Sequence, residues 1–383
     1  MVLGATAALI AGFATADAQT PAPAAKATSV PQAETSDVGT LPAASPRWVY
    51  VLGGFGLSGV RAFDGETAKM KGQVDASPRS SFSLDPKGKY YYAAETFWSK
   101  IDRGVRQDQV TIWDGSTLKV VGEIPIPGRL IGGTVLSNFT VSTDGKLGYV
   151  YTLQPSSSVQ VVDLEKHKLL QTVQLPGCAA VFPSGASDAS ALCADGSLAT
   201  ISSKGGVTHT APFFPVNEDP VFDVVAMDRS KNTAFFISYT GKVYSATLGA
   251  SAQFAKPWSL QAAAGMREAV NKPLEVSWIP GGRQPFALNR ATGRLYVLMH
   301  MGEQWSQKEA GEEVWVVDTA THKILSRHPL KDKVGAIQVS QEAKPLVYLT
   351  TSDGKLLVVD EDTFETKHTV EHLGGGLMVT EPS

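Results

Sequence analysis

The feature that most constrains this chain is an internal repeat of about 49 residues that fills the sequence from about residue 47 onward. Each copy has an apolar β-rich run, a short polar turn and a second β-rich run. The clearest copies are VRAFDGETAKMKGQV from Val60, VTIWDGSTLKVVGEI from Val110, VQVVDLEKHKLLQTV from Val159, VWVVDTATHKILSRH from Val314 and LLVVDEDTFETKHTV from Leu356. Two weaker copies begin at Leu198 and Val243, which brings the number of repeats to seven.

A second recurring unit precedes most of these copies and also consists of a strand, a polar turn and an apolar strand. Examples are FSLDPKGKYYYAAE from Phe82, TVSTDGKLGYVYTL from Thr140 and ALNRATGRLYVLMH from Ala287. Their Gly-containing turns reverse the chain. Two hairpins per repeat predict a four-stranded antiparallel sheet, and seven such sheets around an axis predict an all-β, seven-bladed β-propeller. We expect the strands at 48–54 and 377–379 to close the ring by joining the two chain ends.

An aspartate ends the first run in the five clearest copies. These residues are Asp64, Asp114, Asp163, Asp318 and Asp360. An aspartate that begins a turn can accept hydrogen bonds from nearby backbone N–H groups. We therefore predict that these carboxylates cap turns and have no catalytic role.

The composition limits the possible classes of protein. The chain has 383 residues, of which 43% are apolar and 19% charged, and its formal net charge is −3. This is enough apolar material for a large core, and it excludes collagen, a disulfide-dense miniprotein and disorder over most of the chain. The absence of a basic run argues against nucleic-acid binding, which depends on clustered Lys and Arg.

The N-terminal region is predicted to lie outside the repeats. Residues 2–16 are small and apolar, and Ala16-Asp17-Ala18 fits a cleavage site, so we interpret residues 1–18 as a signal peptide and expect export to the periplasm. The basic residues that usually precede such a segment are missing. Either the true start codon lies upstream, or the segment is a short buried or membrane-lying helix. It is too diluted by Gly and Ala to span a membrane.

Two further regions follow the signal peptide. Residues 19–46 are rich in Pro, Ala, Ser and Thr without periodicity, which is typical of a flexible linker. Residues 47–383 contain all the repeats and are predicted to be the propeller.

The sequence contains no recognisable catalytic constellation. It lacks a G-x-S-x-G elbow, a Cys–His nucleophile signature and a phosphate-binding loop. None of the seven histidines belongs to a zinc motif, and His368 and His372 fall on a strand-like stretch, where positions i and i+4 lie about 13 Å apart. We predict no catalytic residue and no metal site in this chain.

Cys178 and Cys193 lie 15 residues apart and are the only cysteines. In an exported protein they predict one disulfide across a hairpin. Closing a loop of this size stabilises a fold by roughly 3 kcal/mol in the chain-entropy description. The alternative is a pair of buried free thiols.

The segment from Phe97 to Asp108 interrupts the strand pattern and is predicted to be a longer, charged loop between the two hairpins of one blade. Its Arg103, Arg106 and Asp108 suit an ion pair or an interface, because guanidinium groups bind carboxylates at two points. A solvated loop is the alternative.

The same region carries a family resemblance. Residues 101–114, IDRGVRQDQVTIWD, resemble the signature R-G-x-R-x-D-x-V-x-[VI]-[FW]-D of the heavy chains of quinoprotein amine dehydrogenases, which include methylamine and aromatic amine dehydrogenases. Further matching segments in the same order are EDPVF at 218–222, SYTGKVYSA at 238–246, WIPGG at 278–282 and RLYVLMH at 294–300. The two cysteines also fall where that family places a disulfide.

The resemblance implies an exported seven-bladed propeller that is a non-catalytic heavy subunit. In that family it assembles with a small, disulfide-rich light chain, as two heavy and two light chains. The light chain carries the tryptophan tryptophylquinone cofactor and the catalytic base. The complex oxidises a primary amine to aldehyde and ammonia and passes electrons to a periplasmic copper protein, a cupredoxin. Phe55 matches the position of an aromatic residue near the family's substrate channel.

Two other functions stay open on the sequence alone. One is a stand-alone periplasmic propeller hydrolase or isomerase of the lactonase-like kind, which would need metal ligands or acid/base residues at the central channel. The other is a module that binds a ligand or partner on one face. A neighbouring gene for a small cysteine-rich chain would favour the heavy-subunit hypothesis over both.

Overall fold

The computed structural model describes residues 39–53, 59–101, 103–132, 135–249, 251–373 and 375–379. These residues are nearly all strands and turns. Within the described ranges the only helices are α1 (Leu260–Ala263) and the 3₁₀-helix η1 (Val135–Ser137). Neither has the length that crossing a membrane would require.

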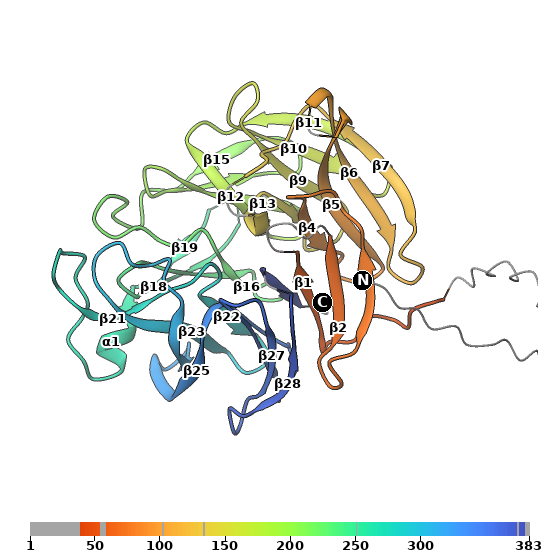
Figure 1. Cartoon of the computed structure of the whole chain (residues 1–383). Coiled ribbons are helices and arrows are strands. Elements are labelled where there is room, and N and C mark those ends of the chain that lie inside the picture. Colours follow the sequence, from red (N-terminus) through yellow and green to blue (C-terminus); the bar gives the residue numbers. More distant parts are fainter. Residues whose placement is uncertain are drawn as a thin grey trace, which may run out of the picture. The chain divides into compact units, whose positions relative to one another are not determined.

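The strands form successive antiparallel sheets, each built outward from an inner strand (Figure 1). From inside to outside, the first contains β29 (Leu377–Val379), β1 (Trp48–Leu52), β2 (Val60–Asp64) and β3 (Met70–Val74). The second contains β4 (Ser81–Leu84), β5 (Tyr90–Lys100), β6 (Arg103–Asp114) and β7 (Val120–Ile126). The third contains β8 (Phe139–Val141), β9 (Leu147–Thr152), β10 (Ser158–Asp163) and β11 (Lys168–Gln174). The fourth contains β12 (Cys178–Ser184), β13 (Asp188–Cys193), β14 (Leu198–Ile201) and β15 (Val207–His209).

Two larger sheets complete this part of the chain. The fifth contains β16 (Ala226–Asp228), β17 (Thr233–Ile237), β18 (Lys242–Thr247) and β19 (Gln253–Phe254), and β20 (Trp258–Ser259) also pairs with β18. The sixth contains β21 (Ser277–Pro280), β22 (Phe286–Asn289), β23 (Arg294–Gly302), β24 (Gly311–Asp318), β25 (Lys323–Val339), β26 (Leu346–Thr351), β27 (Leu356–Asp360) and β28 (Thr366–Val370).

The chain is an all-β propeller, but the prediction of seven four-stranded blades is wrong. The structure shows five separate blades, four with four strands and one with five, followed by one eight-stranded sheet. The cause is β25, a strand of 17 residues. Its first part pairs with β24, where Lys323 lies opposite Asp318, and its last part pairs with β26, where Val339 lies opposite Val347. The last two sequence repeats therefore share one continuous strand and one sheet.

The two ends of the described chain meet in the first sheet, as expected. β29 pairs with β1, with Val379 opposite Val49. The side chain of Gln284, which is buried, adds a second link. Its Nε2 donates to the carbonyl oxygen of Leu377 and its Oε1 accepts from the N–H of Leu377, each at 2.9 Å. The amide thereby pairs with β29 in the way a strand backbone would.

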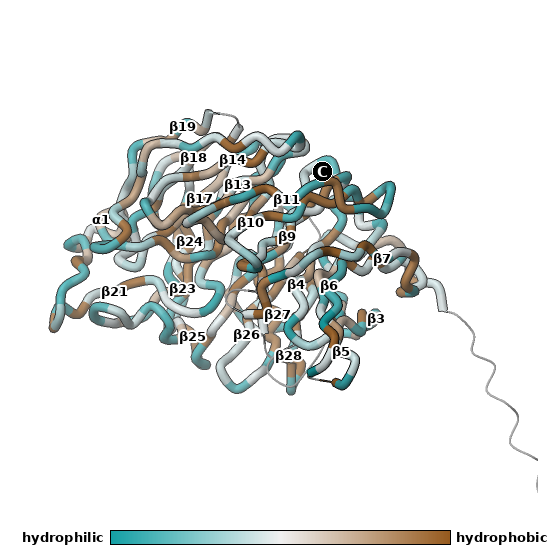
Figure 2. Tube along the Cα trace, turned by 90° about the horizontal axis from the view of Figure 1, so that it is seen from above, coloured by the Kyte–Doolittle hydropathy of each residue, from teal (hydrophilic) through white to brown (hydrophobic). Residues whose placement is uncertain are grey.

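The apolar runs of the repeats are buried because both faces of a sheet pack against neighbouring sheets. All six residues of β10 are buried, as are the first four of β27. Figure 2 shows such apolar stretches along the strands, for example in β24 and β27. The inner strands surround a central cavity of about 180 Å³. Four buried aromatic residues contribute to its wall: Phe82, Phe139, Phe182 and Phe286.

The recurring aspartates cap turns, as the sequence predicts. Oδ1 of Asp114 accepts hydrogen bonds from the N–H groups of Ser116 (3.1 Å) and Thr117 (2.8 Å). The same two-bond arrangement is present at Asp163, Asp318 and Asp360, and Asp64 accepts one such bond. The carboxylates therefore satisfy backbone donors at the reversal of each hairpin.

The residue four positions after each of these aspartates has an unusual backbone conformation, and at three of the turns it contacts the preceding sheet. These residues have positive φ: Ala68, Leu118, His167, His322 and Phe364. A Cβ placed on Gly122 of β7 would lie only 2.6 Å from the ring of His167, and one on Gly72 of β3 would lie 2.5 Å from Leu118. Glycine at these two positions permits the close approach of the capped turn, which fixes one sheet against the next.

Candidate functional site

Among the described residues, the connections between second and third strands lie on one face of the propeller, because the strands run outward from the inner strands. We call this the connection face and define it by the connections β5–β6, β9–β10, β13–β14, β17–β18, β23–β24 and β26–β27. Loops on a rigid scaffold often carry function. By sequence, Phe55 belongs to the β1–β2 connection, but it lies outside the described residues.

The segment 97–108 is part of a long hairpin on this face and not the expected loop. β5 and β6 have 11 and 12 residues, whereas their neighbours β4 and β7 have 4 and 7. The pairing continues to Lys100 opposite Arg103. Ladder hydrogen bonds join backbone groups and do not require apolar side chains. A charged sequence can therefore extend a strand beyond the body of its sheet.

The tip of this hairpin is apolar and exposed. Ile101 is 97% exposed and Val105 75%, and Phe97 is partly exposed. Arg103 lies at the same tip and is exposed. Large apolar side chains gathered on a projecting element favour a contact surface for another molecule.

The base of the hairpin is held by a buried polar network. Arg106 Nε lies 2.8 Å from Asp108 Oδ2, which forms the ion pair considered from the sequence. Arg106 also donates to the Arg129 carbonyl (2.7 Å) and to Gln154 Oε1 (3.2 Å). Asp108, which is buried, accepts a hydrogen bond of 2.5 Å from the Thr96 hydroxyl. These bonds connect both strands of the hairpin to the next sheet.

Arg129 is the central cation of this network and was not anticipated from the sequence. It is 2% exposed, and its Nε donates to Thr96 Oγ1 at 2.8 Å. Its Nη1 donates to the carbonyl groups of Arg79 (3.1 Å) and Leu130 (3.2 Å). Burial lowers the pKa of Arg129 to about 10, against the opposing effect of Asp108. No motif marks this arginine, because it follows an ordinary strand.

Glu95 adds a second buried carboxyl group beside this network. It is 1% exposed and accepts a hydrogen bond from the N–H of Ser77. Burial raises the pKa of Glu95, and the hydrogen bonds from Thr111 and Ser77 and the charge of Arg129 partly offset that effect. The side chains of Glu95, Thr96, Asp108 and Arg129 therefore support the hairpin from beneath.

A second exposed apolar area lies around the β23–β24 connection. Leu274 is 89% exposed, and Val276, Met301 and Trp305 are also exposed. The Trp305 ring meets the Tyr239 ring edge-on, with centroids 6.1 Å apart. The sequence does not predict this area, because its residues come from separate segments that no motif marks. Together with the hairpin tip, it gives the connection face two exposed apolar areas.

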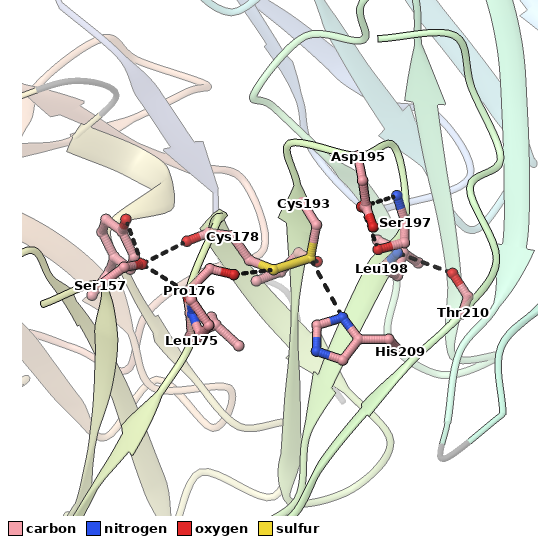
Figure 3. The surroundings of a disulfide bond; sticks show 12 residues. Ser157, Leu175, Pro176, Cys178, Cys193, Asp195, Ser197, Leu198, His209 and Thr210 are labelled. Carbon is pink, nitrogen blue, oxygen red and sulfur yellow. Dashed lines mark hydrogen bonds between the residues drawn. A yellow bond between two sulfur atoms is a disulfide. The ribbon is translucent and has the colours of Figure 1, made fainter.

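The predicted disulfide is present and joins the paired strands β12 and β13 (Figure 3). Cys178 and Cys193 lie directly opposite each other and are buried, so the alternative of free thiols is wrong. His209 on β15 points its Nδ1 toward Cys193 Sγ, at 4.0 Å. Among the described residues, these three are the only group of His, Cys, Asp or Glu side chains that could hold a metal ion.

Comparison with known proteins agrees with the resemblance seen in the sequence. The profile of a family described as methylamine dehydrogenase heavy chain (MADH) matches residues 47–381. The methylamine dehydrogenase heavy chain of Methylophilus methylotrophus is 30% identical over 375 residues, covering 96% of this chain and 90% of the relative. That of Methylobacillus flagellatus is 31% identical over 304 residues, covering 78% of this chain and 74% of the relative.

Solved structures show similarity of fold. The dihydro-heme d1 dehydrogenase NirN aligns with a TM-score of 0.54 at 15% identity, covering 88% of this chain and 76% of that chain. The β-propeller domain of Cps50 (Swd1) from Myceliophteria thermophila aligns with a TM-score of 0.56 at 11% identity, covering 82% and 93%. At these identities the match extends to the propeller architecture alone.

Proposed function

Because the chain belongs to the methylamine dehydrogenase heavy-chain family, we propose that it is the non-catalytic heavy subunit of a periplasmic amine dehydrogenase. The complex contains two heavy and two small, disulfide-rich light chains and oxidises primary amines to aldehyde and ammonia. The observation that carries this proposal is the family match, which extends over the whole propeller region, residues 47–381. The names of the relatives make methylamine the first substrate to test.

The cofactor in this proposal, tryptophan tryptophylquinone, belongs to the light chain together with the catalytic base. The quinone accepts the electrons of the amine, which then pass to a cupredoxin. In this chain Trp278 and Trp315 lie with ring centroids 6.0 Å apart. Arg327 stacks on both rings, and Trp315 is fully buried, so packing accounts for the pair. This arrangement supports a structural role for Trp278 and Trp315.

The connection face is the surface proposed to receive the light chain. Its hairpin tip presents Ile101 and Val105, and its second area presents Leu274 and Trp305. Interface centres are enriched in apolar and aromatic residues and in arginine. The buried network of Arg106, Asp108, Thr96 and Arg129 keeps the hairpin in one position before binding, which reduces the entropy lost on association. Phe55, from the β1–β2 connection, is proposed to lie near the route of the substrate.

The test is to isolate a tagged chain from the periplasm of the source organism and to identify its partners by mass spectrometry. The wild type should carry a small cysteine-rich chain whose mass includes a crosslinked, oxidised tryptophan pair. The double variant Ile101→Glu/Val105→Glu should lose that chain, because two charges would be buried in an apolar contact. Leu170→Glu, on the outer strand β11, is the matched control and should retain it. A hairpin variant that keeps its partner would contradict the docking site, and a wild type without any such partner would contradict the function.

A further inference from the structure

Cys178, Cys193 and His209 bring a metal-binding donor set together at the edge of the fourth sheet (Figure 3). The two sulfur atoms and one imidazole nitrogen all lie within 4.8 Å of one another. Two thiolates and an imidazole are ligands that Zn²⁺ and other thiophilic ions prefer. In the disulfide the sulfurs bond to each other, so neither thiolate is available.

The strand register explains why these residues converge. Cys178 on β12 lies opposite Cys193 on β13. Ala191, two residues before Cys193, lies opposite Ala199 on β14, and Ala199 in turn lies opposite His209 on β15. Residues two apart on a strand share a face of the sheet. The imidazole therefore lies on the same face of the sheet as Cys193, and the approach does not depend on a flexible loop.

The surroundings offer access to this position. Both cysteines are buried, but His209 is exposed on the short outer strand. An ion could reach the site from this exposed edge of the sheet, and water could occupy the fourth position that a three-ligand site leaves open.

We propose that reduction of the Cys178–Cys193 disulfide opens a Cys₂His site for Zn²⁺ or a similar thiophilic ion, with His209 as the third ligand. A dithiol reductant supplies two electrons and two protons: the S–S bond breaks, two thiols form, and the dithiol becomes a disulfide. On metal binding, each thiol releases its proton to solvent as its sulfur coordinates the ion. Disulfide and bound ion are mutually exclusive, so a bound ion keeps the pair reduced.

The test uses the full chain and Co²⁺ as a spectroscopic substitute for Zn²⁺. The chain is reduced with a dithiol, freed from it under anaerobic conditions and titrated with Co²⁺. We expect a thiolate-to-cobalt charge-transfer band that saturates at one ion per chain and disappears when Zn²⁺ is added. The oxidised chain should show no such band. A reduced chain that shows no saturable band would overturn the proposal.

The variant His209→Asn distinguishes a site with three ligands from metal binding by the two cysteine thiolates alone. We expect it to weaken Co²⁺ binding by more than about tenfold, since loss of even an outer-shell partner reduces metal affinity by that much. His372→Asn removes another exposed histidine, on the sixth-sheet side of the chain, and is the matched control. Equal affinities for His209→Asn and the wild type would rule out His209 as a ligand.

A second measurement tests the proposal in case the chain loses its structure when the disulfide is reduced. If the reduced chain loses its near-ultraviolet circular dichroism, one equivalent of Zn²⁺ should restore it, because ligand binding to the folded state stabilises that state. Reduced chain that stays unfolded with Zn²⁺ would also count against the proposal.

Discussion

Arg129 and Asp108 are joined through a single hydroxyl group. Thr96 Oγ1 accepts a hydrogen bond from Arg129 Nε (2.8 Å) and donates one to Asp108 Oδ1 (2.5 Å). All three side chains are buried. The three residues belong to β5, β6 and the segment that leads into the next sheet. The hydroxyl therefore connects the base of the projecting hairpin to the neighbouring sheet.

Replacing Thr96 with Val tests this connection. The methyl group keeps the shape but removes the hydroxyl partner of Arg129 Nε and of Asp108 Oδ1. We expect a loss of about 1–3 kcal/mol in the free energy of unfolding, measured by urea denaturation. Thr96→Ser keeps the hydroxyl and should retain more of that stability than Val does. Equal stability of the Val variant and the wild type would contradict a supporting role for the network.

The capped turns predict a dependence of stability on pH. Hydrogen bonds from Ser116 and Thr117 lower the pKa of Asp114 to about 2, from 3.8. The folded-state pKa lies below the unfolded value, so the stabilisation is present above about pH 4 and is lost as the pH falls toward 2. Asp114→Asn should therefore be less stable than the wild type at pH 7, and the difference should shrink over that range.

Thermal unfolding of both proteins between pH 7 and pH 2 measures this effect. Asp332→Asn, which alters an exposed aspartate, serves as the control and should change stability little at any pH. A difference between Asp114→Asn and the wild type that stays constant down to pH 2 would show that charge does not contribute to the cap.

Gln284 is expected to be important for closing the ring. Both its amide atoms bond to the backbone of Leu377. Gln284→Leu would leave one buried N–H and one buried C=O without partners, which should cost about 1–3 kcal/mol in the free energy of unfolding. Gln284→Glu keeps an acceptor but loses the donor, and it should also destabilise the chain. Hydrogen exchange at β29 and β1 would report the effect locally, and unchanged exchange in both variants would exclude this role.

The capped turns, the disulfide and the buried strands could be predicted from the sequence, because each depends on residues close to one another in the chain. The Asp-capped turns depend on one carboxylate and the N–H groups two and three residues later, as at Asp114. The cysteine pair lies across one hairpin, which makes the disulfide a short-range property. The apolar runs indicated buried strands because sheets cover them on both faces.

Features that depend on pairing between distant or polar segments could not be predicted. The part of β25 from Pro329 to Val334 contains three charged residues, yet Pro329 lies opposite Glu313 and Val334 opposite Gly311, which keeps the strand continuous. The projecting β5–β6 hairpin could not be predicted for the same reason, since backbone pairing keeps its charged residues in extended strands. The place of Arg129 depends on groups 33 and 50 residues away, and no local pattern signals such contacts.

The most direct test of the proposed function is the visible spectrum of the complex isolated natively with this chain, recorded before and after addition of methylamine. A heavy subunit of an amine dehydrogenase should co-purify with a quinone absorption band that bleaches when the amine reduces the cofactor and returns when a cupredoxin reoxidises it. A colourless preparation that contains this chain alone, with no spectral response to any primary amine, would contradict the account.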